Sequence, residues 1–300
     1  MPNKSRALRF APLALIAVAV VWGGAFVVMK PAIESQPIVD FLGTRFVIAA
    51  AVMILAKPSV LKQLRGPLMW QGLVLGLLMT IAYYTQTVGL QLTTAAISGF
   101  VTGLYVVISP LLIWLLLKVK VSGKVWIGVI LALGGLAFIS VNPQSLSFEW
   151  QQLWLVACAF FFSLHIAGLA HWSPKQDAYA LTVVQLSVVG LVNMIWSGVQ
   201  GYHAPVGAYG WFAILFTAVF STAIAFFVQT WAQGVMDSSR VAIYLTSETV
   251  FSALIAVAVG QEVLKLQTIL GGVLILCAML VVEWPGKRGS SGLPVENLPH

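Results

Sequence analysis

Charged residues are scarce in this sequence: Asp, Glu, Lys and Arg make up 8% of its 300 residues, whereas a soluble domain contains roughly 25%. Hydrophobic residues make up 60%, and the mean hydropathy is +0.96. A soluble protein of this length could not bury so much apolar surface, but a lipid bilayer can accept it. The composition therefore excludes a soluble globular domain and indicates a membrane protein.

Cysteines and catalytic motifs are scarce as well. Cys158 and Cys277 lie in apolar runs, which indicates core packing and no disulfide. The sequence lacks the phosphate-binding pattern G-x-x-x-x-G-K-S/T, the zinc pattern H-E-x-x-H and the nucleophile pattern G-x-S-x-G. His165 lies inside an apolar run, where a lone histidine is more often hydrogen-bonded to a neighbouring helix than catalytic. We therefore expect no ATP-driven pump, no enzyme, no metal and no cofactor.

Prolines, glycines and charged residues divide the chain into apolar runs of about the 20 residues that a transmembrane helix needs. We predict an all-α integral membrane protein with ten transmembrane helices. They cover residues 11–29, 37–56, 68–90, 95–117, 124–141, 151–170, 179–199, 208–233, 238–260 and 266–284. The polar stretch 286–300 is predicted to be a disordered cytoplasmic tail.

The net charge of +7 does not indicate nucleic-acid binding, because no basic stripe is interleaved with aromatic residues. The basic residues instead follow the positive-inside rule. If the N-terminus is cytoplasmic, the outer loops hold Lys30 and Lys265, and Arg45 lies within a span. The cytoplasmic segments hold Lys4, Arg6, Arg9, Lys57, Lys62, Arg65, Lys118, Lys120, Lys124, Lys175, Arg240, Lys287 and Arg288. We predict a multi-pass protein of the cytoplasmic membrane with both termini in the cytoplasm.

The two halves of the chain share a spaced set of residues. One constant shift in residue number, which we call the main shift, aligns the segment 84–87 with 227–230 and Ser109 with Ser252. A slightly smaller shift, which we call the shorter shift, aligns Arg45 with Gln185. Five spans per half is an odd number, so the second half would enter the membrane from the opposite side, as in many secondary transporters. We predict two inverted five-helix repeats, residues 1–145 and 146–285. The alternative is chance similarity between apolar helices.

Four stretches of the sequence resemble a known family. They are Trp22-Gly23-Gly24-Ala25-Phe26 with Lys30, Arg45-Phe46 with Ala49-Ala50, Gly103-Leu104-Tyr105 through Pro110, and Glu248-Thr249-Val250 through Gly260-Gln261-Glu262 with Gly271. In order and spacing they are similar to the EamA-type permeases of the drug/metabolite transporter superfamily. The resemblance implies a ten-helix, inverted-repeat carrier of amino acids or other small metabolites, often working outward.

Two positions depart from the family pattern. Thr249 stands where the family usually has proline after the glutamate, and Lys118-Val119-Lys120 stands where the first half often carries an acid. The first departure affects the local flexibility of the helix, and the second weakens any role that depends on that acid.

Arg45 and Glu248 are predicted to lie in the middle third of the bilayer, where a charge costs at least about 2.5–3.5 kcal/mol. Glu248 is either a cavity carboxylate that meets a substrate amine or a proton, or one half of a structural ion pair with Arg45. For Arg45 we favour helix packing or a fixed counter-charge over substrate contact.

Equivalent positions of the two repeats should point into one cavity. The main shift pairs Tyr105 with Glu248 and Gln86 with Gln229. For these pairs we favour a substrate cavity over interhelical hydrogen bonding. Four further aromatic residues are candidates for stacking on a planar substrate, with core packing or, near the span ends, the interfacial aromatic belt as the alternative. They are Trp22, Tyr83, Tyr84 and Tyr244.

These features predict a secondary transporter that moves a small metabolite, an amino acid or similar, by alternating access and in the direction of export. The alternatives are a facilitative channel and a scaffold that transports nothing. The expected partners are a small-molecule substrate and the lipid bilayer, with a proton as candidate coupling ion and a homodimer as candidate assembly. The sequence does not identify the substrate.

Overall fold

The computed structural model describes residues 4–93, 95–140, 150–260 and 266–283, and helices are its only regular elements in these ranges. The α-helices are α1 (Lys4–Ser35), α2 (Ile38–Ala56), α3 (Pro67–Leu92), α4 (Ala95–Gly103), α5 (Tyr105–Leu117), α6 (Gly123–Ser140), α7 (Gln152–Trp172), α8 (Ala178–Gln200), α9 (Gly207–Phe216), α10 (Ala225–Val235), α11 (Ser238–Leu245), α12 (Glu248–Ala258) and α13 (Leu266–Glu283). Two short 3₁₀-helices, η1 (Pro58–Gln63) and η2 (Ser173–Lys175), lie in connections, and η3 (Thr217–Ile224) is a π-helix.

The ten predicted spans are confirmed. Seven are single helices, and three are divided: α4 with α5, α9 with η3 and α10, and α11 with α12. Within the described ranges, six helical segments are both long and apolar enough to cross a membrane, and further apolar helices are shorter. The predicted tail 286–300 lies outside the described residues.

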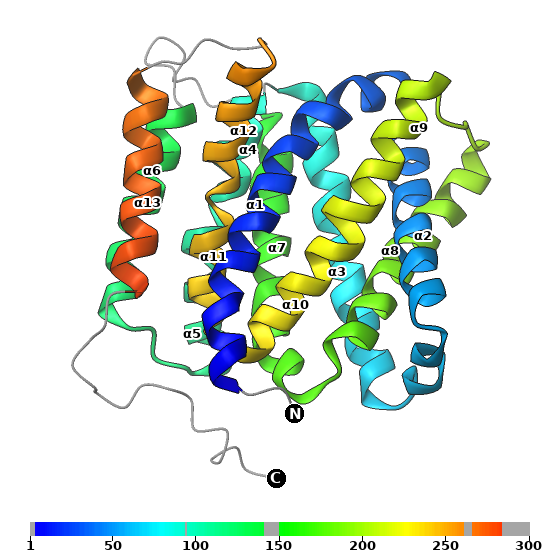
Figure 1. Cartoon of the computed structure of the whole chain (residues 1–300). Helices are drawn as coiled ribbons and strands as arrows, with labels where there is room; N and C mark the ends of the chain where they lie inside the picture. Colours follow the sequence, from blue (N-terminus) through cyan, green and yellow to red (C-terminus); the bar gives the residue numbers. More distant parts are fainter. Residues whose placement is uncertain (1–3, 94, 141–149, 261–265, 284–300) are drawn as a thin grey trace.

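The helices repeat along the chain in the predicted way. The break between α4 and α5 falls at Leu104, and the main shift carries that position to Ser247, in the break between α11 and α12. Helices α6 and α13 are related by the same shift from end to end. Two pairs of equivalent helices also pack against each other, α6 on α13 and α2 on α8 (Figure 1). This packing is expected when an approximate two-fold axis runs between two inverted repeats.

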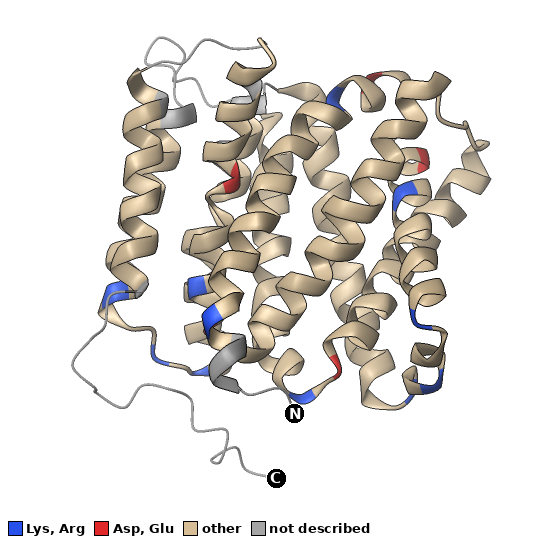
Figure 2. Cartoon of the chain, in the orientation of Figure 1, with Lys and Arg blue, Asp and Glu red and all other residues tan. Residues whose placement is uncertain are grey.

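The first and last described residues of the chain lie on the same side of the helix bundle. We call this side of the bundle the near end and the opposite side the far end. Helix α1 begins there and α13 finishes there (Figure 1). Basic residues gather at the near end (Figure 2). They belong to the connections after α2, α5 and α7 and to the start of α11, as the predicted charge pattern requires.

The interior contains two large hydrophobic clusters. One is built mainly from α2, α3, α8 and η3, and the other from the first half of α1 with α5, α6, α10, α11 and α13. Trp22 of α1 and Phe162 of α7 pack against both clusters. The two aromatic residues therefore mark the boundary between the clusters.

Candidate functional site

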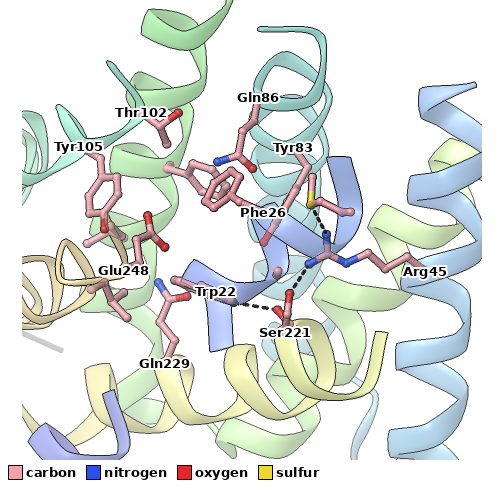
Figure 3. A pocket seen from close by; sticks show the side chains of 15 residues that line it. Trp22, Phe26, Arg45, Tyr83, Gln86, Thr102, Tyr105, Ser221, Gln229 and Glu248 are labelled. Atoms are coloured by element: carbon pink, nitrogen blue, oxygen red, sulfur yellow. Dashed lines mark hydrogen bonds between the residues drawn. The ribbon is translucent and has the colours of Figure 1, made fainter. Parts of the chain in front are cut away.

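A cavity lies at this boundary, in the middle of the bundle. It comprises about 580 Å³ of space between atoms, part of which is open to solvent. Seven of the residues predicted from the sequence line it: Trp22, Arg45, Tyr83, Gln86, Tyr105, Gln229 and Glu248 (Figure 3). They come from helices of both repeats, including the two predicted pairs of equivalent positions.

Two aromatic candidates, Tyr84 and Tyr244, do not line this cavity. Tyr84 stacks on Trp196, with ring centroids 5.3 Å apart. The side chain of Tyr244 is 5% exposed and packs in the second hydrophobic cluster, together with α5 and α13. The next residue, Leu245, lines the cavity instead. Successive residues of a helix point about 100° apart, so the two side chains cannot face the same way.

Arg45 is held by the second repeat. Its Nε donates to Thr222 Oγ1 at 2.7 Å, and its Nη2 donates to Ser221 Oγ at 2.9 Å. The guanidinium carbon also lies 5.3 Å from the ring centroids of Phe46 and Tyr83, within cation–π range. These contacts fix the positive charge at one side of the cavity.

Arg45 does not form an ion pair with Glu248. An ion pair of 3.2 Å instead joins Asp40, near the start of α2, to His203. Figure 3 shows Arg45 and Glu248 on opposite sides of the cavity, with Trp22 and Tyr83 between them. The guanidinium of Arg45 and the carboxyl group of Glu248 therefore face the same space without a direct contact.

The partners of Arg45 lie on the π-helix η3. The looser turn also presents the carbonyl oxygen of Ser221 to the Nε1 of Trp22, which donates to it at 2.8 Å. Single-turn π-helices inside α-helices are frequent at functional sites. Sequence analysis missed Ser221 and Thr222; the only signal was two adjacent hydroxyl residues at the centre of a predicted span.

A chain of amides sets the orientation of Gln229. Gln233 Nε2 donates to the carbonyl oxygen of Ile166 at 3.1 Å and to Ser238 Oγ at 2.8 Å. Because a carbonyl can only accept, Gln233 Oε1 is left to accept from Gln229 Nε2 at 3.3 Å. Gln229 Oε1 then remains as a buried acceptor with no partner, as does the hydroxyl of Tyr105. Such atoms call for water or a ligand.

Glu248 begins α12, directly after a break in the helix. Three neighbouring hydroxyls satisfy carbonyls at the break, since Thr246, Ser247 and Thr249 each donate to the carbonyl three residues earlier at 2.6 Å. Thr249 also donates its backbone N–H to Thr246, a bond that a proline could not make. The break places a carboxylate at mid-depth without leaving unsatisfied carbonyls at these positions in the hydrocarbon.

Metal binding has no visible basis in the described part of the chain, where no three His, Cys, Asp or Glu residues gather closely enough to hold an ion. The cavity combines aromatic walls, amides and two separated charges. This arrangement suits recognition of a small polar molecule.

Comparisons with known proteins agree with this architecture. An uncharacterized transporter of Archaeoglobus fulgidus is 32% identical over 274 residues, which cover 91% of this chain and 86% of the relative. The uncharacterized transporter YvbV of Bacillus subtilis is 24% identical over 283 residues, 92% of each chain. A crystal structure of a protein superposes with a TM-score of 0.76 and 19% identity, covering 91% of this chain and 96% of the other, so the fold is shared.

The model of the EamA-like transporter family matches residues 9–141 and again residues 149–284. The double match agrees with the duplicated arrangement of helices and with the resemblance noted in the sequence. The expectation of a membrane transporter in place of an enzyme is confirmed. The chain is a multi-pass membrane protein that belongs to the EamA-like transporter family.

Proposed function

We propose that this transporter is a secondary carrier that exports an amino acid or a similar small metabolite by alternating access. The observation that carries the proposal is the placement of Arg45 and Glu248 on opposite sides of one central cavity, without an ion pair between them. A zwitterionic metabolite complements this pattern, with its anionic group toward Arg45 and its amine toward Glu248.

The residues around each charge fit these roles. On the Arg45 side, Nη1 contacts the sulfur of Met29 at 4.0 Å, and a thioether is a weak acceptor. On the Glu248 side, Gln229 Oε1 adds a second acceptor for an ammonium group. Arg45 thus acts as a fixed positive charge, and Glu248 with Gln229 forms the cation-accepting side.

A proton is the coupling ion that the cavity supports best. Glu248 is the acidic residue among those that line it, and it can take up or release a proton as the cavity alternates between the two sides. In this scheme proton and substrate amine compete for the same carboxylate, which couples their movements.

The proposed arrangement in the membrane is two repeats, 1–145 and 146–285, with the near end in the cytoplasm. The basic residues at that end support this orientation through the positive-inside rule. Homodimer formation stays a prediction that analytical ultracentrifugation in detergent can test.

The test is a screen of amino acids by thermal shift on the purified protein, followed by counterflow in proteoliposomes. A ligand of the folded state raises the unfolding temperature. A carrier should show saturable counterflow of the stabilising compound. Flux that does not saturate would favour a channel, and absence of both stabilisation and flux across the screen would favour a scaffold.

A further inference from the structure

The two repeats make matching aromatic contacts beside the cavity. The rings of Tyr83 and Phe162 lie 5.3 Å apart, and those of Phe226 and Trp22 lie 5.4 Å apart. The main shift carries Tyr83 to Phe226, and the shorter shift carries Trp22 to Phe162. The second contact is therefore the repeat-related copy of the first, with Phe162 as the equivalent of Trp22.

A second contact supports the same correspondence. The backbone of Gly23 lies against the carbonyl of Glu248, and a Cβ added at Gly23 would be 2.7 Å from that oxygen. In the other repeat, Ser163 Oγ donates to the carbonyl of Tyr105 at 3.4 Å. The shorter shift also carries Gly23 to Ser163, so positions of α1 correspond to positions of α7 by that shift.

The repeats nevertheless line the cavity unequally. Ala25 and Arg45 line it, but their equivalents by the shorter shift, His165 and Gln185, do not. All four side chains are buried, Ala25 and Arg45 at 4% and 2% exposure and His165 and Gln185 at 0% and 1%, so the two pairs differ in whether they line the cavity and not in burial. Ala25 follows Trp22 as α1 runs to the far end, whereas His165 lies on α7, which runs to the near end (Figure 1). Phe162 and Ile166 of α7 line the cavity as their equivalents Trp22 and Phe26 of α1 do, whereas His165 and Gln185 are closed off from it, unlike Ala25 and Arg45.

The packed pair retains an unsatisfied polar atom. Gln185 Nε2 donates to the carbonyl of Leu181 at 3.1 Å, so its Oε1 faces His165 Nε2 at 2.7 Å. The neutral imidazole must then carry its proton on Nε2, which leaves Nδ1 as an acceptor. That Nδ1 is buried and has no partner. Helix packing alone does not explain an acceptor left in this state.

We propose that His165 and Gln185 form a second, alternately exposed part of the substrate path. Rocking two inverted repeats about a central site closes one half and opens the equivalent positions of the other. When the carrier opens to the near end, His165 therefore lines the cavity as Ala25 does here, and Nδ1 accepts a hydrogen bond from an N–H or O–H group of the substrate. This inference rests on the alternating access of the proposed function.

The test is one-sided cysteine labelling of the full chain in sealed membrane vesicles. The background carries Cys158→Ala and Cys277→Ala, and the single variants are Ala25→Cys, His165→Cys and Gln185→Cys. The probe is a charged, membrane-impermeant methanethiosulfonate, applied to right-side-out or inside-out vesicles. The cysteine-free background is the control for labelling, and monodisperse elution in detergent is the control for folding.

We expect Ala25→Cys to react from the far-end face and His165→Cys from the near-end face, each roughly tenfold or more faster than from the other face, because minor states are populated at about 0.1–10%. Gln185→Cys should behave as His165→Cys does, and it replaces that variant if His165→Cys does not fold. Labelling of Ala25→Cys alone, or of all three from one face, would overturn the inference and leave the proposed cavity intact. Absence of labelling at Ala25→Cys would overturn the cavity itself.

Discussion

The backbone of Gly23 in α1 lies directly against the backbone of Glu248 in α12. A Cβ at Gly23 would stand 2.7 Å from the carbonyl oxygen of Glu248 and 2.6 Å from the nitrogen of Ser252. Both atoms belong to the main chain of a helix, so neither can rotate away. The glycine therefore sets how closely the two helices approach and where the carboxylate stands.

Gly23→Ala should destabilise the protein by about 1–3 kcal/mol, the usual cost of overpacking. The matched control is Gly24→Ala, whose added methyl would meet only the end of Ile255, at 3.4 Å. Thermal unfolding in detergent measures both variants. Equal unfolding temperatures for the two would show that α1 and α12 are not in this close contact.

Arg45→Gln should lower the folded yield and should also weaken substrate binding by the folded fraction, because Arg45 faces the anionic group of the proposed substrate. The substitution removes the positive charge and leaves the hydroxyls of Ser221 and Thr222 without their donor, at about 1–3 kcal/mol for a buried group left unpaired. Fluorescence-detected size exclusion measures the yield, with the exposed Arg65→Gln as control. A normal yield would show that these contacts do not stabilise the fold, and an unchanged affinity would contradict the proposed place of the anionic group opposite Arg45.

Glu248→Gln should leave the protein folded and flatten the pH dependence of transport, because the amide keeps the shape and removes the ionisation. Active transport should fall, while exchange at equal pH survives at least in part. Counterflow and pH-jump flux at matched protein density measure the two activities. Glu34→Gln, on an exposed position of α1, is the control. If the Glu248 variant keeps the wild-type pH profile, that residue has no part in coupling.

Reporter fusions test the orientation in the membrane. A fusion at Gly289 should behave as cytoplasmic and a fusion near Ser145 as external, because the near end carries the basic connections. Dual reporters that are active on opposite sides of the membrane give the readout. An external signal at Gly289 would contradict the proposed orientation.

Much of the fold could be predicted because hydrophobic length and charge placement act locally. Each predicted span corresponds to a helix or a divided helix. The breaks could not be predicted with the same means. The one at Thr246 and Ser247 contains neither proline nor glycine, and it is stabilised by side-chain hydroxyls that would also be compatible with a continuous helix.

The candidate site was predictable where the repeat supplied a second copy. Gln86 with Gln229 and Tyr105 with Glu248 line one cavity. Side chains at equivalent positions of two inverted repeats point toward the same central site. Tyr244 had no such support and lies in the core. Ser221 is a contact of Arg45 from the opposite half of the chain, and no local pattern specifies a contact across 176 residues.

The same separation has a consequence for biosynthesis. Arg45 enters the membrane long before Ser221 and Thr222 have been translated, since 176 residues separate it from the nearer of them. At about 5–20 residues per second, this delay is roughly 9–35 seconds. During that time the nascent chain holds a cation in its second span without its final partners, at a cost of about 2.5–3.5 kcal/mol near the bilayer centre. We therefore expect the second span to depend on the insertion machinery or on local water until the eighth span arrives, and to reach its final place late although it is made early.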